Sequence, residues 1–199
     1  MKKAVFLDRD GTLNPLVYNA EFGIVDSPAN PDEFSLIPGV AGAVKLINSL
    51  GLLAIVISNQ PGIAKGKFSI NLLEKMTGKM QDELYKKGAC LDAVYYCYHH
   101  PQGRVAEYSM VCDCRKPKPG LLIQAASEFD VDLSRSYFIG DGITDIQAGQ
   151  SAGTTNFLIY PSSNCFICEE LSRNHTQPDY MVKNLMNAVQ IVEQIENCL

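Results

Sequence analysis

The chain has 199 residues, which is enough for one domain with a full hydrophobic core. Hydrophobic residues make up 46% of it and charged residues 20%, which is ordinary for a globular protein. The formal net charge of -5 argues against a broad basic face for nucleic acid, although a cleft lined by a few cations can still bind a small anion.

The sequence shows no segment that predicts export or membrane insertion. The first apolar run, Ala4–Leu7, is too short for a signal peptide. No run approaches the roughly 20 apolar residues that span a bilayer. We therefore expect a cytoplasmic monomer without membrane contact. Its seven cysteines, an odd number, favour thiolate metal ligation over disulfide bonds in that compartment.

Short apolar runs alternate with amphipathic stretches along the chain. The predicted strands are Ala4–Leu7, Leu52–Ile57, Ala93–Cys97, Tyr137–Ile139 and Asn156–Tyr160. The predicted helices are Val40–Leu50, Ile70–Lys87 with Ser69 as its N-cap, Gly120–Phe129, Asp145–Ala152 and Leu185–Ile195. This alternation predicts one α/β domain over residues 1–199, with a Rossmann-like, mainly parallel sheet covered by helices on both faces.

Two long segments, Asn14–Pro38 and Tyr98–Pro119, are predicted to be irregular loops, and loops of this length are usually functional or disordered. The acidic residues of the first loop, which include Asp26 and Glu33, are interpreted as solvent-facing. In parallel sheets, ligands bind beyond the carboxyl ends of the strands. The polar residues that follow the predicted strands are therefore the candidate site.

The segment Asp8–Thr12, with the sequence DRDGT, directly follows the first predicted strand. Its two carboxylates, Asp8 and Asp10, can hold a hard cation such as Mg²⁺, and a carboxylate can also attack a phosphoryl group. Asp141 follows another strand and would complete a carboxylate metal site opposite Asp8. An Asx turn that ends the first strand is the alternative interpretation.

Three further groups follow strand ends or lie in the second long loop. Ser58, Asn59 and Gln60 offer a hydroxyl and backbone N–H groups for phosphoryl oxygens, with a plain turn as the alternative. Lys116 would neutralise phosphate, and Arg115 would grip a second anionic group through two hydrogen bonds, unless both belong to a solvated basic loop. Asp145 would orient Lys116 or the waters of a metal ion, with a helix N-cap as the alternative.

The full set resembles the four motifs of the haloacid dehalogenase (HAD) superfamily of phosphotransferases, in order: Asp8–Thr12, Ser58, Lys116, and Gly140-Asp141 with Asp145. The resemblance implies that Asp8 is a nucleophile that forms an aspartyl phosphate and that Asp10 is first general acid and then general base. It implies that Lys116 and Ser58 hold phosphoryl oxygens. It also implies Mg²⁺ on the Asp8 and Asp141 carboxylates and the Asp10 carbonyl. The intervals between the motifs are too short for a large cap domain.

A narrower resemblance rests on Cys97-Tyr98-His99-His100-Pro101 and Cys112-Asp113-Cys114. These segments are similar to a subfamily of capless phosphatases with a zinc-stapled loop, here at about residues 97–114. By family position the zinc ligands are Cys97, His99, Cys112 and Cys114, a set typical of a closed structural site. His100 remains an alternative to His99. Reduced cysteines packed as small hydrophobic residues are the alternative to zinc. Cys165 and Cys168 have only half of a metal-site spacing.

This subfamily includes heptose-bisphosphate phosphatases and histidinol-phosphate phosphatases, and Ser58–Gly66 is more similar to the first group. The resemblance implies a small phosphorylated substrate, with the 7-phosphate of a heptose 1,7-bisphosphate as the group removed. Asn59 and Gln60 would line the substrate site, and Lys65 and Arg115 would hold the second phosphate. Histidinol phosphate, another sugar phosphate and a nucleic-acid 3′ phosphate are the alternative substrates, and the acidic net charge argues against the last. A domain that binds phosphometabolites without turnover is the alternative to an enzyme.

Overall fold

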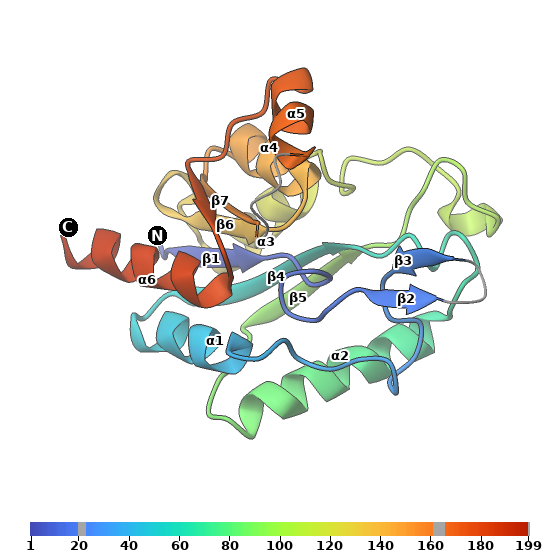
Figure 1. Cartoon of the computed structure of the whole chain (residues 1–199), viewed down its shortest axis with the longest axis horizontal. Coiled ribbons are helices and arrows are strands. Elements are labelled where there is room, and N and C mark those ends of the chain that lie inside the picture. Colours follow the sequence, from blue (N-terminus) through green and yellow to red (C-terminus); the bar gives the residue numbers. More distant parts are fainter. Residues whose placement is uncertain (20–22, 161–165, 199) are drawn as a thin grey trace.

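The computed structural model describes residues 1–19, 23–160 and 166–198 (Figure 1). Its centre is a six-stranded sheet in the order β5-β4-β1-β6-β7-β8, in which all neighbouring strands are parallel. The strands are β1 (Ala4–Leu7), β4 (Leu53–Asn59), β5 (Ala93–Cys97), β6 (Tyr137–Gly140), β7 (Thr155–Ile159) and β8 (Tyr180–Val182).

Helices cover both faces of this sheet (Figure 1). On one face lie α1 (Val40–Ser49), α2 (Ile70–Tyr85) and α6 (Leu185–Asn197). On the other face lie α3 (Gly120–Phe129), α4 (Ile143–Ala152) and α5 (Phe166–Arg173). The predicted fold class, a Rossmann-like α/β domain with a mainly parallel sheet, is confirmed. None of the helices in these described ranges is long and apolar enough to cross a membrane.

The alternation of side chains along β1 divides the core into two layers. Val5 and Leu7 pack with α1 and α6, whereas Ala4 and Phe6 pack with α3. All four side chains are fully buried. Burial of one Leu or Phe side chain contributes roughly 1.5–3 kcal/mol to the hydrophobic term. The continuous apolar run that predicted this strand therefore follows from burial on both faces.

Three features of the structure were not predicted. The segment 14–38 contains an antiparallel hairpin of β2 (Val17–Asn19) and β3 (Ile24–Asp26), so the expectation of an irregular loop there is wrong. Strands of three residues are too short to show a clear alternation of apolar and polar side chains. Strand β8, also of three residues, was missed for the same reason, and the eight-residue helix α5 was not predicted either. The predicted N-cap of α2 is confirmed, because Ser69 Oγ accepts from Leu72 N at 3.3 Å.

The strand order brings the candidate residues to one edge of the sheet. Asp8 follows β1, Ser58 lies near the end of β4, and Asp141 follows β6. Because β1 pairs with both β4 and β6, these three strand ends are neighbours. Cys97 ends β5 at the same edge. From β1, the chain adds β4 and β5 on one side of the sheet and β6, β7 and β8 on the other. Ligands bind in such sheets at this switch point, beyond the carboxyl ends of the strands.

Candidate active site

A buried lysine joins two carboxylates at this edge. Lys116 Nζ lies 2.7 Å from Asp8 Oδ1 and 2.6 Å from Asp145 Oδ1, and it donates to the Ile57 carbonyl at 3.0 Å. Burial and the Asp145 charge raise the pKa of Asp8 to about 6, against the opposing effect of Lys116. Burial alone would lower the pKa of Lys116, but Asp145 and Asp8 raise it above its usual value. The lysine is therefore a cation at neutral pH.

Asp145 combines the two roles that the sequence left open. Its Oδ2 accepts from the backbone N–H of Gly142, the N-cap residue of α4, at 2.9 Å. Its Oδ1 faces Lys116. Asp145 therefore stabilises the first turn of α4 and also orients the lysine.

Asp141 lies against the turn that carries Asp8. A Cβ atom at Gly11, which has φ of +87°, would lie 1.9 Å from Asp141 Oδ2, so only glycine allows this close approach. Carboxylate oxygens of Asp8, Asp141 and Asp145 all lie within 4.8 Å of one another. Burial and the charges of Asp8 and Asp145 raise the pKa of Asp141 to about 8. Clustered, desolvated carboxylates of this kind fit a hard divalent cation, whose charge would relieve their repulsion.

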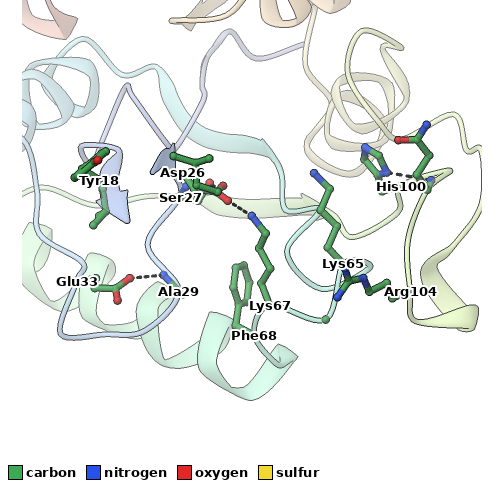
Figure 2. Close-up of a pocket in the computed structure, with 14 residues that line it drawn as sticks. Tyr18, Asp26, Ser27, Ala29, Glu33, Lys65, Lys67, Phe68, His100 and Arg104 are labelled. Atoms are coloured by element: carbon green, nitrogen blue, oxygen red, sulfur yellow. Dashed lines mark hydrogen bonds and ion pairs between the residues drawn. The ribbon is translucent and has the colours of Figure 1, made fainter. Parts of the chain in front are cut away.

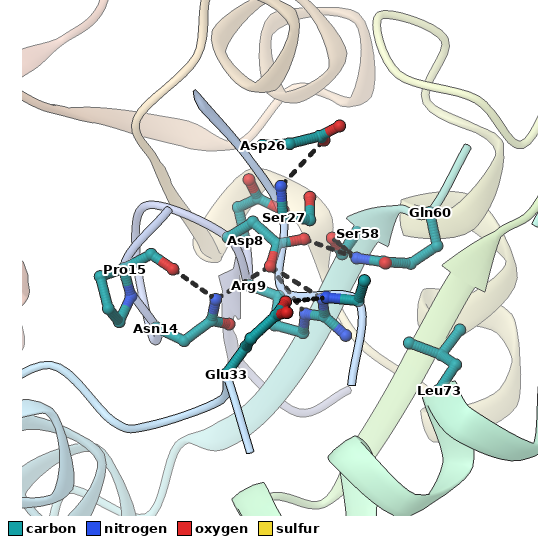
Figure 3. A network of polar contacts seen from close by, with 12 residues as sticks. Asp8, Arg9, Asn14, Pro15, Asp26, Ser27, Glu33, Ser58, Gln60 and Leu73 are labelled. Carbon is teal, nitrogen blue, oxygen red and sulfur yellow. Dashed lines mark hydrogen bonds and ion pairs between the residues drawn. The ribbon is translucent and has the colours of Figure 1, made fainter. Parts of the chain in front are cut away.

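The carboxylate of Asp10 is held by a network of donors. Arg9 donates to Oδ1 from Nε at 3.1 Å and from Nη2 at 2.8 Å, and Asn14 donates to the same oxygen at 2.9 Å. Gln60 Nε2 donates to Oδ2 at 2.7 Å. Figure 3 shows Arg9, Asn14 and Gln60 close together in this network, and all three are fully buried. The network fixes the orientation of Asp10, and sequence reasoning gave no role to Arg9 or Asn14.

Ser58, Asn59 and Gln60, which follow the predicted second strand, have different surroundings in the structure. Gln60 also donates to Ser58 Oγ at 3.1 Å and is buried behind Asp10, so in this structure it supports these two residues, and its contact with a substrate stays a prediction. The side chain of Asn59 bonds both the N–H and the carbonyl of Lys116, each at 3.1 Å. Asn59 therefore fixes the backbone that carries the lysine, and it also lines the cleft.

These residues surround a cleft of about 220 Å³, which we call the reactive cleft. Asp8, Asp10, Ser58, Lys116 and Asp141 line it. Two residues that the sequence analysis did not single out, Ser27 and Thr144, line it as well.

A larger space of about 830 Å³ adjoins the reactive cleft, and we call it the hairpin cavity. Tyr18 of the hairpin and Phe68 contribute apolar surface, and Lys65, His100 and Arg104 also line it (Figure 2). The backbone N–H of Arg104 donates to the Ala64 carbonyl at 2.7 Å, which places Arg104 next to the loop of Lys65. Arg104 was missed because its position depends on this contact between distant segments.

Arg115 lines neither of these two spaces. Its Nη1 donates to the His99 carbonyl at 3.2 Å, and its charge is one cause, after slight burial, of the lowered pKa of His100. Arg115 therefore supports the backbone of the segment that carries His99, a candidate zinc ligand, and lies near one wall of the hairpin cavity.

The second cluster consists of Cys97, His99, Cys112 and Cys114. The three sulfur atoms lie 3.2–3.5 Å apart, and His99 Nδ1 lies 3.3 Å from Cys114 Sγ and 3.7 Å from Cys97 Sγ. Thiolate and imidazole ligands of a tetrahedral zinc ion lie about 3.5–3.8 Å apart, so the cluster fits this metal.

His100 is not in this cluster, because its Nδ1 accepts from Gln102 N at 3.1 Å and it lines the hairpin cavity. The structure therefore favours His99 over His100 as the ligand. Cys90 and Cys198 are exposed thiols. Cys165 and the side chain of Cys168 lie outside the described part of the chain.

Comparison with known proteins gives related matches. A family model described as HAD-hydrolase-like matches residues 113–188. The D-glycero-beta-D-manno-heptose-1,7-bisphosphate 7-phosphatase of Pasteurella multocida is 36% identical over 197 residues, which cover 99% of this chain and 100% of the relative. The phosphatase of the same name from Escherichia coli K12 is 42% identical over 149 residues, which cover 75% of this chain and 74% of that relative.

Among solved structures, the chain is similar to D,D-heptose 1,7-bisphosphate phosphatase from B. bronchiseptica, which was crystallised with magnesium and phosphate. The TM-score is 0.79 at 27% identity, and the match covers 97% of this chain and 99% of that one. The sequence and structure matches both extend over nearly the whole chain, so they include the sheet and the loops around both spaces.

Proposed function

Because the chain belongs to the family of HAD-like phosphatases that includes these heptose-bisphosphate 7-phosphatases, we propose that it removes the 7-phosphate of D-glycero-D-manno-heptose 1,7-bisphosphate. The observation that carries this proposal is the buried group of Asp8, Lys116 and Asp141 beside a space large enough for a sugar. The reacting phosphate would occupy the reactive cleft, and the sugar with its other phosphate would occupy the hairpin cavity.

In the first step, a carboxylate oxygen of Asp8 attacks phosphorus in line with the sugar oxygen. The bond from phosphorus to that oxygen breaks, and the leaving alkoxide takes a proton from Asp10. With its pKa raised to about 6, Asp8 is mostly ionised at neutral pH and can serve as the nucleophile. Arg9 and Gln60 hold Asp10 in position for the proton transfer.

In the second step, Asp10 removes a proton from water, which attacks the phosphorus of the aspartyl phosphate. The bond from phosphorus to Asp8 breaks, so inorganic phosphate leaves and the free carboxylate is restored. Lys116 and Ser58 hold phosphoryl oxygens during both steps. The contribution of the protein is then mainly positioning and electrostatic stabilisation.

Two metals complete the proposal. A magnesium ion held by the Asp8 and Asp141 carboxylates and the Asp10 carbonyl would supply positive charge against the phosphate and the nucleophile. Zinc on the four-residue Cys/His cluster would be structural. Cys114 precedes Lys116 by two positions in the sequence, so ordering of this loop also orders the lysine.

The cations of the hairpin cavity support a bisphosphate as the substrate. The Lys65 ammonium and the Arg104 guanidinium have no hydrogen-bond or ion-pair partner among the described residues. Neighbouring cations without partners attract an anionic group. Histidinol phosphate would instead bring its own ammonium group to a wall that already carries these two cations. The charge of the cavity therefore favours a sugar bisphosphate.

The test is phosphate release from D-glycero-D-manno-heptose 1,7-bisphosphate with Mg²⁺, with the product identified by ³¹P NMR. We expect the 1-phosphate to remain on the sugar. Asp8→Asn should lower kcat on the order of 10⁴-fold or more, because an amide is a very poor nucleophile. Asp130→Asn is the matched control, since Asp130 is exposed and pairs only with the N-terminal amine among the described residues.

Each failure has a separate meaning. Activity of Asp8→Asn within tenfold of the wild type would contradict the covalent mechanism. Release from an aryl phosphate without release from the bisphosphate would contradict the substrate. Turnover of neither would favour the phosphometabolite-binding alternative.

A further inference from the structure

Ser27 lies where the reactive cleft and the hairpin cavity meet. It lines the space of about 220 Å³ next to Asp8 and Asp10, and it also lines the space of about 830 Å³ next to Tyr18. Among the described residues, it is the one that the two linings share. A leaving group that extends from a phosphate in the cleft into the cavity therefore passes Ser27.

The side chain of Ser27 is available to a ligand. Its backbone N–H donates to Asp26 Oδ1 at 2.9 Å, whereas its hydroxyl forms no hydrogen bond with the described residues. A hydroxyl can both donate and accept, so it suits a sugar hydroxyl.

Ser27 is hydrogen-bonded to one member of an ion pair, and both members of that pair line the hairpin cavity. Asp26 accepts from the Ser27 N–H with one carboxylate oxygen and pairs with the Lys67 ammonium through the other (Figures 2 and 3). Lys67 belongs to the loop after β4, and its own N–H donates to the Gly62 carbonyl at 2.8 Å. The ion pair therefore connects the hairpin to a loop anchored on the central sheet.

The hairpin has little other means of holding this geometry. Its strands are three residues long and pair only with each other in the described structure. Tyr18 and Val25 are 65% and 61% exposed, so they add little buried apolar surface. An isolated two-stranded hairpin is marginally stable in water. The connection from Asp26 to Lys67 is therefore suited to fix the end of β3 beside the reactive cleft.

We propose that the Ser27 hydroxyl hydrogen-bonds a hydroxyl group of the sugar leaving group, and that the Asp26–Lys67 ion pair holds Ser27 in position to do so. The inference rests on the proposed phosphatase function and deepens it. It makes Ser27 a specificity residue for polyhydroxylated phosphate esters and makes Lys67 a positioning residue that acts through Ser27.

The experiment compares two substrates, the heptose 1,7-bisphosphate and p-nitrophenyl phosphate, whose flat ring offers no hydroxyl to Ser27. Ser27→Ala should lower kcat/KM for the bisphosphate roughly 3–10-fold and change the aryl phosphate less than about twofold, as expected for one neutral hydrogen bond. Lys67→Met should show the same selective loss, and Lys67→Arg should keep kcat/KM for the bisphosphate near that of the wild type. Arg173→Met is the matched control, because it removes another exposed ion pair, with Glu169, away from both spaces.

The double variant Ser27→Ala/Lys67→Met separates positioning from direct binding. If Lys67 acts through Ser27, kcat/KM of the double variant for the bisphosphate is no lower than that of the less active single variant. If Lys67 holds the substrate itself, the two losses multiply and the proposed positioning is wrong. Equal losses on both substrates, or none on the bisphosphate, would overturn the role of Ser27. A wild-type protein that hydrolyses neither substrate would refute the proposed function, and the inference with it, whereas an active wild type with an unchanged substrate ratio refutes the inference alone.

Discussion

The reactive cleft and the hairpin cavity adjoin each other but are held in different ways. In the cleft, Lys116 is 3% exposed and lies between Asp8, which directly follows β1, and Asp145, in the first turn of α4. In the cavity, Lys65 and Arg104 come from loops and have no polar side-chain partner among the described residues. In the proposed function, the central sheet would therefore fix the reacting groups, whereas loops that can vary without disturbing the sheet would recognise the leaving group.

This difference has a direct kinetic consequence. In the proposed function, a small aryl phosphate would occupy only the reactive cleft, whereas a sugar bisphosphate would occupy both spaces. Variants in the cleft should affect both substrates, and variants in the cavity should affect only the second.

Asp10→Asn should depend strongly on the leaving group. General acid catalysis contributes roughly 10²–10⁴-fold, so the heptose bisphosphate should lose about this factor in kcat while an activated aryl phosphate loses far less. The fold should survive, because Gln60 Oε1 is buried without a partner among the described residues and can accept from the new amide after its own amide rotates. Equal losses on the two substrates in steady-state assays would contradict the acid role.

The zinc cluster should stabilise the loop that contributes to both spaces. We expect one tightly bound zinc per chain by elemental analysis, and its loss in Cys112→Ser and His99→Ala. Loss of the metal should lower Tm by roughly 10 °C, since part of its binding free energy is folding free energy.

His100→Ala is the matched control for the zinc prediction and should keep both zinc and stability. Cys90→Ser, at an exposed thiol, serves the same purpose for the cysteine. Zinc retained by His99→Ala but lost by His100→Ala would reverse the ligand assignment.

The sheet and the arrangement of the cleft were largely predictable because each depends on local sequence. Apolar runs predicted the buried strands, and polar residues placed directly after them had to meet at one edge. The local sequence also indicates which of His99 and His100 belongs to the cysteine cluster. Side chains alternate in extended chain, so Cys97 and His99 point the same way as β5 ends. That alternation would have favoured His99 without the structure.

The rest depends on contacts between distant segments. Arg9 is fully buried and lies 5.7 Å from the centre of the Tyr96 ring, which no local pattern of an Arg between two Asp residues indicates. Gln60 N continues the pairing with β5 by donating to the Cys97 carbonyl at 2.7 Å, and its side chain lies beneath the turn of Asp10. Asp26 was interpreted as solvent-facing because its partner, Lys67, comes from another loop.

Magnesium should stabilise the protein most at higher pH. Without metal, the pKa of Asp141 is raised from 3.8 to about 8, so the folded state binds more protons than the unfolded state across this window. The free energy of unfolding should therefore fall as pH rises from about 4 to 8, with Asp8 adding to the fall up to about pH 6. Excess Mg²⁺ should raise Tm by roughly 5–10 °C at pH 8 and by less at pH 6.

Thermal unfolding of wild type and Asp141→Asn, with and without Mg²⁺, measures this linkage. The difference between the two proteins isolates Asp141 from other titrating groups. The variant should lose both the magnesium effect and its share of the pH dependence. A wild type that gains stability over Asp141→Asn as pH rises in magnesium-free buffer would show the opposite linkage.

The smallest expected effect separates two arginines that were assigned differently by sequence and by structure. The resemblance assigned the second phosphate to Arg115, whereas Arg104 is the arginine that lines the hairpin cavity. Arg104→Ala should lower kcat/KM for the bisphosphate roughly tenfold, as expected for loss of a charged hydrogen bond, and leave the aryl phosphate unchanged. Arg115→Ala removes the hydrogen bond to the His99 carbonyl, so it should act on both substrates alike through the zinc loop and Lys116. If Arg115→Ala instead affects the bisphosphate alone and Arg104→Ala affects neither, then Arg115 turns toward the substrate when it binds. The division between a fixed cleft and a separate recognition cavity would then be wrong, because one residue would support the catalytic loop and bind the leaving group.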